Sequence, residues 1–200
     1  MFSRQDVLLT FLLEAVRLTD QRWIDASFCL ARFVQPHYLD VDIQYLGIVE
    51  AILDGWEKTF TPIYHRQIKG DYDFNSDPYP FLYTHINAVS KMWVLSGYEI
   101  LRVIYNQLEN NSNAPILPDE FKTLFWQFTM VRMETAKYEH ARVSNSTGNP
   151  TNVMQIDSDG ICRVGWRVYC KKSNTIKDII RKNLAEEFVE TFREMKETYR

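Results

Sequence analysis

The sequence predicts a mainly helical protein: a bundle of about five or six helices with a small antiparallel β-hairpin before the C-terminal helix. Three observations lead to this class. Apolar residues recur every three or four positions through most of residues 1–143, which is the period of a half-buried helix. The period changes to two over residues 162–170, as in a half-buried strand. The helical period returns after residue 175.

Length and composition favour a single domain with a substantial core. The chain has 200 residues, of which 46% are hydrophobic, and this is enough apolar surface for one core. We expect residues 1–143 to form the bundle, 153–171 the hairpin and 175–198 the last helix. The net charge is only −3, so no global positive field points to nucleic acid.

Five helices are expected before the hairpin. Their predicted ranges are 5–19, 21–34, 40–68, 81–108 and 119–141. A break at Pro62 in the third is left open, because proline cannot donate the hydrogen bond of a helix interior. Gly97 lies in the middle of the fourth helix, where glycine costs up to ~1 kcal/mol relative to alanine. We therefore expect a neighbouring helix to approach closely at Gly97.

The hairpin prediction is based on strict alternation in "CRVGWRVYC". Val164, Trp166 and Val168 share one face, and the opposite face carries Arg163 and Arg167. Residues 153–156 form the expected partner strand, with "DSDG" at the turn. Two strands alone are marginal in water, so the apolar face should pack on the bundle or on another subunit.

Several functional classes have no supporting motif. The sequence contains no glycine-rich phosphate loop, no nucleophile elbow and no histidine or cysteine spacing typical of zinc. We therefore expect neither a metal nor a cofactor. The N-terminal apolar run is interrupted by Glu14 and Arg17, and it is shorter than the ~18 apolar residues of a membrane span. A cytoplasmic protein is the expectation.

A polar interruption in the fifth predicted helix gives the first candidate site. Arg132 continues an aromatic stripe that runs through residues 121–128. Either the helix emerges into solvent there, or Arg132 stays covered and neutralises Glu99, which would form a partly buried pair with Arg102 on the fourth helix. The candidates for this polar cluster or ligand site are Glu99, Arg102, Arg132, Lys137 and His140.

A basic segment gives the second candidate site. Residues 163–182 contain seven Lys and Arg against one acid, Asp178, a balance of +6. The segment is either a solvated strand face or a contact for phosphate, as in RNA or a nucleotide. The candidates for anion binding are Arg163, Arg167 and Lys171.

In general architecture the predicted bundle resembles HEPN domains, helical proteins often associated with RNA cleavage. Their catalytic Arg and His lie closer together than Arg132 and His140, which are separated by seven residues. We therefore assign no site residue in this chain from the resemblance. The sequence favours a non-catalytic binding or regulatory module that acts through protein–protein contact as a homodimer. The alternative is a HEPN-like RNA-binding or metal-independent RNA-processing protein, or another enzyme acting on an anionic substrate, and whether the chain is an enzyme stays open.

Overall fold

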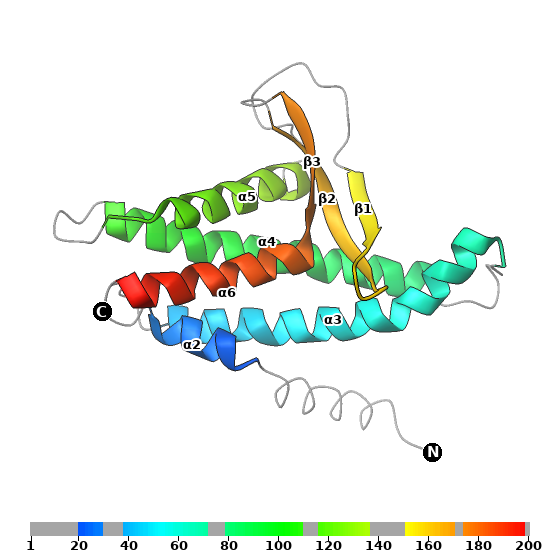
Figure 1. The fold of residues 1–200 in the computed structure, drawn as a ribbon, viewed down its shortest axis with the longest axis horizontal. Helices are drawn as coiled ribbons and strands as arrows, with labels where there is room; N and C mark the ends of the chain where they lie inside the picture. Colours follow the sequence, from blue (N-terminus) through cyan, green and yellow to red (C-terminus); the bar gives the residue numbers. More distant parts are fainter. Residues whose placement is uncertain are drawn as a thin grey trace.

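The computed structural model describes residues 20–29, 38–71, 79–109, 116–136, 151–170 and 174–198. These ranges contain five helices and a three-stranded antiparallel sheet placed before the last helix, so the predicted mainly helical class is confirmed. The helices are α2 (Gln21–Cys29), α3 (Leu39–Lys69), α4 (Tyr79–Glu109), α5 (Asp119–Ala136) and α6 (Arg181–Thr198). Figure 1 shows the four longer helices running lengthwise, with the sheet standing across them. The helix predicted over residues 5–19 lies outside the described residues.

The long helix α3 is continuous through Pro62, so the chain does not break there. Asp40 and Asp42 lie in its first turn, where their negative charges interact favourably with the positive end of the helix dipole. The helix ends at Lys69, and the next residue, Gly70, has a φ of 79° and donates its backbone N–H to the carbonyl of Gln67. This left-handed cap is a conformation that glycine adopts without steric cost.

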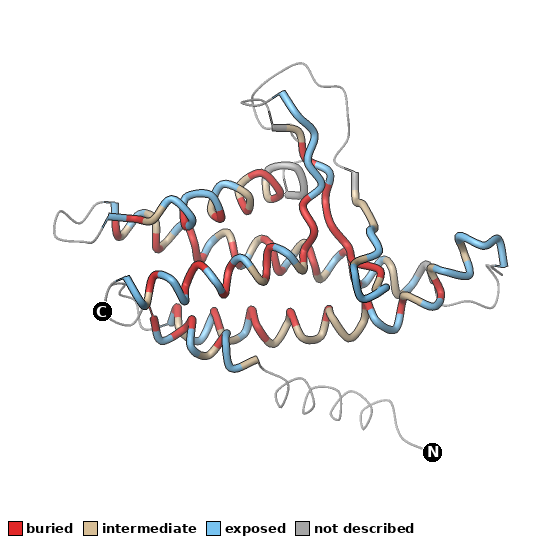
Figure 2. The backbone as a smooth tube through the Cα atoms, viewed as in Figure 1, coloured by how far each residue is buried: buried red, intermediate tan, exposed pale blue. Residues whose placement is uncertain are grey.

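The core lies between α3, α4, α5 and α6, where the buried residues face one another (Figure 2). The indole Nε1 of Trp93 on α4 donates a 3.0 Å hydrogen bond to the carbonyl of Leu46 on α3. A Cβ atom placed on Gly97 would lie 2.4 Å from the ring of Phe128 on α5. The expected close helix approach at Gly97 is therefore confirmed.

The sheet has the order β1 (Thr151–Ile156), β2 (Cys162–Cys170), β3 (Thr175–Ile180). The predicted hairpin partner is confirmed, because Met154 on β1 pairs with Val164 on β2. Val164, Trp166 and Val168 are at most 2% exposed. Strand β2 contacts the helices, so the predicted apolar face packs on the bundle of its own chain.

The last predicted helix is wrong over its first six residues. Residues 175–180 form β3, which pairs antiparallel with β2, and α6 begins only at Arg181. The segment is rich in β-branched residues, which favour strands, and Ile179 and Ile180 are buried. Asn174 precedes it with a φ of 52°, a left-handed conformation that asparagine tolerates at a chain reversal. The predicted hairpin is therefore part of a three-stranded sheet.

Candidate functional site

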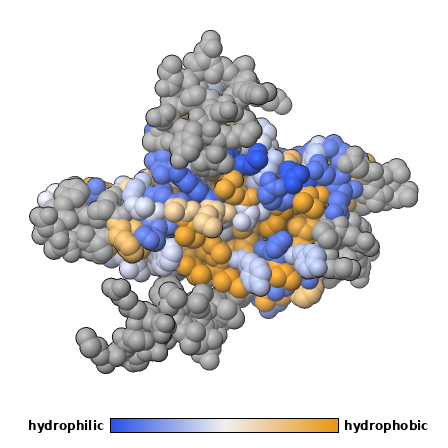
Figure 3. Space-filling view, turned by 180° about the vertical axis from the view of Figure 1, so that it is seen from behind, coloured by the Kyte–Doolittle hydropathy of each residue, from blue (hydrophilic) through white to orange (hydrophobic). Residues whose placement is uncertain are grey.

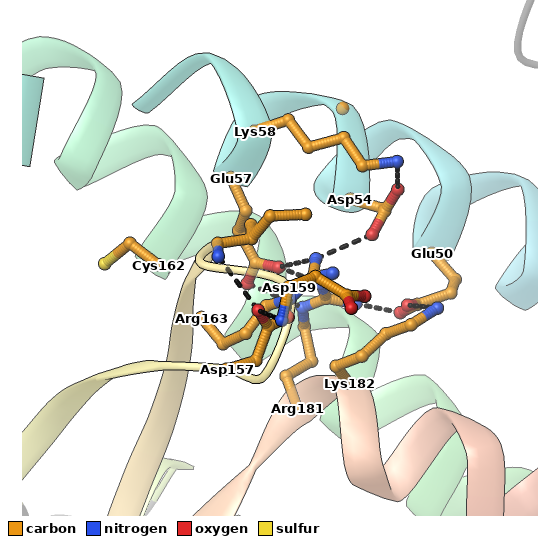
Figure 4. Close-up of polar contacts among 12 residues, drawn as sticks. Glu50, Asp54, Glu57, Lys58, Asp157, Asp159, Cys162, Arg163, Arg181 and Lys182 are labelled. Atoms are coloured by element: carbon orange, nitrogen blue, oxygen red, sulfur yellow. Dashed lines mark hydrogen bonds and ion pairs between the residues drawn. The ribbon is translucent and has the colours of Figure 1, made fainter. Parts of the chain in front are cut away.

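A group of charged side chains joins α3 to the sheet and to the start of α6 (Figure 4). We call it the charge cluster, and its members are Glu50, Asp54 and Glu57 from α3, Asp157 from the β1–β2 turn, Arg163 from β2, and Arg181 from α6. The three acids of α3 lie at positions i, i+4 and i+7, which share one side of a helix. Helix α3 therefore presents a row of carboxylates to the sheet.

Glu57 is the centre of the charge cluster and has no exposed surface. Its Oε2 accepts hydrogen bonds from Arg163 Nη1 at 3.0 Å and Arg181 Nη2 at 2.7 Å. Its Oε1 accepts from the backbone N–H of Val164 at 3.1 Å and from Arg181 Nε at 3.3 Å. Both carboxylate oxygens are thus supplied with donors, as a buried acid requires.

Arg163 links three chain segments through one guanidinium group. Its Nη1 donates to Asp54 Oδ1 at 2.6 Å as well as to Glu57, and its Nε donates to Asp157 Oδ2 at 2.6 Å. The other oxygen of Asp157 accepts the backbone N–H of Ile161 at 2.8 Å. The ion pairs and the β1–β2 turn therefore depend on the same carboxylate.

Arg181 is fully buried where β3 becomes α6. Its guanidinium pairs with Glu50 Oε2 and with both oxygens of Glu57, an arrangement that suits its planar, forked donors. Lys182 reaches the edge of the cluster, with its Nζ 3.5 Å from Glu50 Oε1. Lys58 lies at the other edge and pairs with Asp54 at 2.6 Å. With these two lysines, four acids face four bases.

Burial and pairing shift the ionisation of the charge cluster in opposite directions. Burial raises the pKa of Glu57 to about 7, although the hydrogen bonds from Val164 and Arg163 oppose the shift. Burial also lowers the pKa of Arg181 to about 9, so this guanidinium stays charged at neutral pH. At Asp54 burial is outweighed by hydrogen bonds from Lys58 and Arg163, and the pKa is lowered.

The geometry of the charge cluster suits a structural role better than a chemical one. Glu57 and Arg181 have no exposed surface, so a substrate has no access to them. The nearby thiol of Cys162 is also buried, and burial raises its pKa to about 12, which keeps it un-ionised at neutral pH. The cluster holds β2, the β1–β2 turn and the start of α6 against α3.

A second feature lies on the face that is turned away from the viewer in Figure 1. We call it the apolar groove; it runs between α3 and α4 and has a volume of about 670 Å³. Its apolar walls include Tyr45, Leu46 and Val49 from α3 and Met92, Leu95 and Val103 from α4. Tyr45 is 60% exposed and Met92 is 65% exposed. Figure 3 shows a continuous apolar area across the middle of this face.

The structure describes three of the five residues of the polar cluster predicted around Arg132. Glu99 and Arg102 form an ion pair at 2.7 Å, but their side chains are 51% and 44% exposed, so the expected burial is wrong. Glu99 lies on the wall of the apolar groove, where its side chain is open to solvent. Arg132 is half-buried, with its Cζ 4.3 Å from the ring centroid of Tyr98. Lys137 and His140 lie outside the described residues.

The predicted row of anion-binding residues is also divided by the structure. Arg163 is 4% exposed and is paired with three carboxylates, so the prediction that it binds an external anion is wrong. Arg167 is exposed and forms two hydrogen bonds to Asp178, at 2.8 and 2.9 Å. Lys171 lies outside the described residues. Anion binding by Arg167 stays a prediction.

Sequence reasoning missed the charge cluster, although part of its signal is visible. Glu50 and Glu57 lie between the apolar positions of α3, where Leu46, Leu53 and Phe60 are buried. Arg181 similarly lies between the buried Ile180 and Leu184. A charge inside an apolar ladder indicates a buried ion pair, since unpaired charges are costly to bury. The pattern does not identify the partner.

Across the described ranges, no group of three or more His, Cys, Asp or Glu side chains is placed to hold a metal ion. No helix in these ranges is long and apolar enough to cross a membrane. Comparison of the chain with protein-family models, with curated proteins and with solved structures gave no match. The functional proposal is therefore based on the geometry of this chain alone.

Proposed function

We propose that this chain is a non-catalytic protein-binding module that forms a homodimer, and that the apolar groove is its binding surface. The observation that supports the proposal is the exposure of Tyr45 and Met92 on the two walls of this mainly apolar groove. Large contiguous apolar patches on a folded protein mark interaction sites. Tyrosine and methionine are also enriched in the cores of protein–protein interfaces.

A second copy of the chain suits the charges around the apolar groove. Asp42 and Glu99 lie along the groove, and Arg102 is ion-paired to Glu99 beside it. A rim with both signs of charge can pair with charged side chains of both signs on a second copy. Two-fold homodimers are also the commonest closed assemblies of soluble proteins.

The test is the oligomeric state of the native chain and of a groove variant. Sedimentation of the native protein should give about twice the chain mass of 23.7 kDa, and Met92→Glu should give 23.7 kDa. Met92 is 65% exposed, so the substitution leaves the fold of the chain intact. Ile68→Glu is the matched control, because Ile68 is 62% exposed on α3 but does not line the groove.

The expected effect of Met92→Glu is large because a two-fold interface contains the residue twice. Burying one methionine side chain contributes about 1.5–3 kcal/mol, so two contribute roughly 3–6 kcal/mol. The dissociation constant should rise by about 10²–10⁴-fold. A native protein that sediments at 23.7 kDa at high micromolar concentration would rule out the homodimer.

A second candidate function is binding of RNA or another phosphate-bearing ligand at the β2–β3 part of the sheet. Arg167 and Lys177 are exposed there and support it, on opposite faces of the sheet, because Arg167 pairs with Asp178 and Lys177 pairs with the neighbouring Val168. Fewer basic side chains of residues 163–182 are exposed than the sequence suggests, because Arg163 and Arg181 are buried in the charge cluster. Salt-sensitive RNA retention that is lost in the Arg167→Glu, Lys177→Glu variant would favour this candidate. No retention at low ionic strength would exclude it.

A further inference from the structure

We propose that the apolar groove is occupied by residues 5–19 of a second copy of the chain, exchanged reciprocally between the two copies. This inference depends on the proposed function, because it names the segment through which the homodimer forms. Residues 5–19 lie outside the described residues, and the described chain begins at Asp20, directly before α2.

The shape of the apolar groove favours a single helix as its occupant. The groove is a concave channel between two helices, and two concave surfaces are not complementary to each other. It is about 21 Å long from Val89 to Val103, at 1.5 Å per helical residue. With a width of about one interhelical distance, 8–10 Å, its footprint is roughly 200 Å², whereas a stable interface buries about 800 Å² per partner. With reciprocal exchange, each copy buries both its own helix and its own groove. The dimer then contains two helix–groove contacts instead of one.

The sequence of residues 5–19 has the properties of such an occupant. Leu8, Phe11, Leu12 and Ala15 lie at helical spacing and would form one apolar face. A helix of these 15 residues would be about 22 Å long, which matches the groove. An amphipathic helix that lays its apolar face in an apolar groove is a common mode of recognition.

The position of α2 favours exchange between copies over docking within one chain. Trp23 on α2 packs on Gly47 of α3 and stacks on Phe188 of α6, with ring centroids 5.2 Å apart. Tyr45 and Val49, which line the groove, are each two residues from Gly47 and so point about 160° away around α3. The chain enters α2 on the side of α3 that is opposite the groove.

Docking within one chain would require the N-terminal segment to pass around α3. Half the circumference of a helix about 11 Å wide is roughly 17 Å, which takes about five extended residues. About ten residues, or roughly 15 Å of helix, would then remain for a groove about 21 Å long. The segment of a second copy is not joined to the α2 helix of the chain whose groove it fills, so this restriction does not apply to it.

Disulfide trapping between full-length copies tests the exchange. Leu12→Cys and Met92→Cys chains that carry tags of different size are mixed, partly denatured to allow exchange, refolded and oxidised. We expect a mixed disulfide-linked dimer in which one chain of each kind is present, and none from either variant alone. An intrachain disulfide in a chain with both substitutions, without the mixed dimer, would overturn exchange between copies.

A second measurement separates this inference from the proposed function. Leu12→Glu in the full chain should convert the dimer to a monomer, and Thr10→Glu should not, because Thr10 lies about 160° from Leu12 on the same predicted helix. If Leu12→Glu stays dimeric while Met92→Glu is monomeric, the groove binds the second copy by other residues and the inference is wrong. If the native chain is monomeric, the proposed function is wrong.

Discussion

Breaking the buried pair of Glu57 and Arg181 should strongly destabilise the fold, because it strands one charge in the core. Arg181 donates to both oxygens of Glu57 at 2.7 and 3.3 Å, and neither side chain has exposed surface. Arg181→Met removes the cation and leaves Glu57 with Arg163 as its remaining guanidinium partner. Removing one member of a buried ion pair costs ~3–5 kcal/mol, because the other charge is left in a medium of low polarity.

The assay is urea denaturation at pH 8, where Glu57 is ionised because its pKa is about 7. Arg181→Met should lower the free energy of unfolding by ~3–5 kcal/mol, equivalent to a fall of roughly 6–20 °C in melting temperature for a chain of this size. Lys122→Met is the control; its ion pair with Asp119 is exposed and lies outside the groove, so the change should be at most about 1 kcal/mol.

A double-mutant cycle shows whether the loss comes from the pair itself. Glu57→Gln in the Arg181→Met background removes the stranded carboxylate, so the double variant should be more stable than the sum of the two single losses predicts. Strictly additive losses, or a loss below 1 kcal/mol for Arg181→Met, would refute the reasoning, because buried charges that touch cannot behave independently.

Three further predictions follow from the same contacts. Because the pKa of Glu57 is raised from 4.5 to about 7, its contribution to the free energy of unfolding should fall as pH rises through that window; Glu57→Gln should flatten this part of the pH profile measured by denaturation. Trp166→Ala should cost roughly 3–5 kcal/mol, and an unchanged melting temperature would exclude its packing in the core. Gly97→Ala would place a Cβ 2.4 Å from the Phe128 ring, so it should destabilise by about 1–3 kcal/mol in a thermal melt rather than stabilise the helix.

The features predicted correctly from the sequence are those with a local signature. The 3.6-residue period located the helices, and the alternation around Trp166 identified the buried face of β2. Gly97 indicated a close helix contact, because glycine is costly in mid-helix without such a reason. Strand β3 was missed because Ile176 and Ile180 are four residues apart, a spacing that also fits a helix.

The features that could not be predicted depend on contacts between distant residues. Glu57 meets Arg163 and Arg181 across 106 and 124 positions of the chain, and no local pattern selects those partners. The side of α4 that carries Glu99 and Arg102 was expected to be partly buried. The structure instead leaves Met92 65% exposed on the groove wall. An apolar face that the described residues leave open is what a binding partner would cover.

Stability and self-association should be separable, because they use different parts of α3. The α3 residues that line the groove lie between Leu39 and Val49. The α3 residues of the charge cluster lie between Glu50 and Glu57 and face the sheet and the start of α6. Arg181→Met should therefore lower the melting temperature and remain dimeric below it. Met92→Glu should be monomeric and should lose the dependence of the melting temperature on protein concentration, since a dimer is stabilised by mass action. If Arg181→Met dissociated under native conditions, the two regions would be coupled through α3, and the groove could not be treated as an independent binding surface.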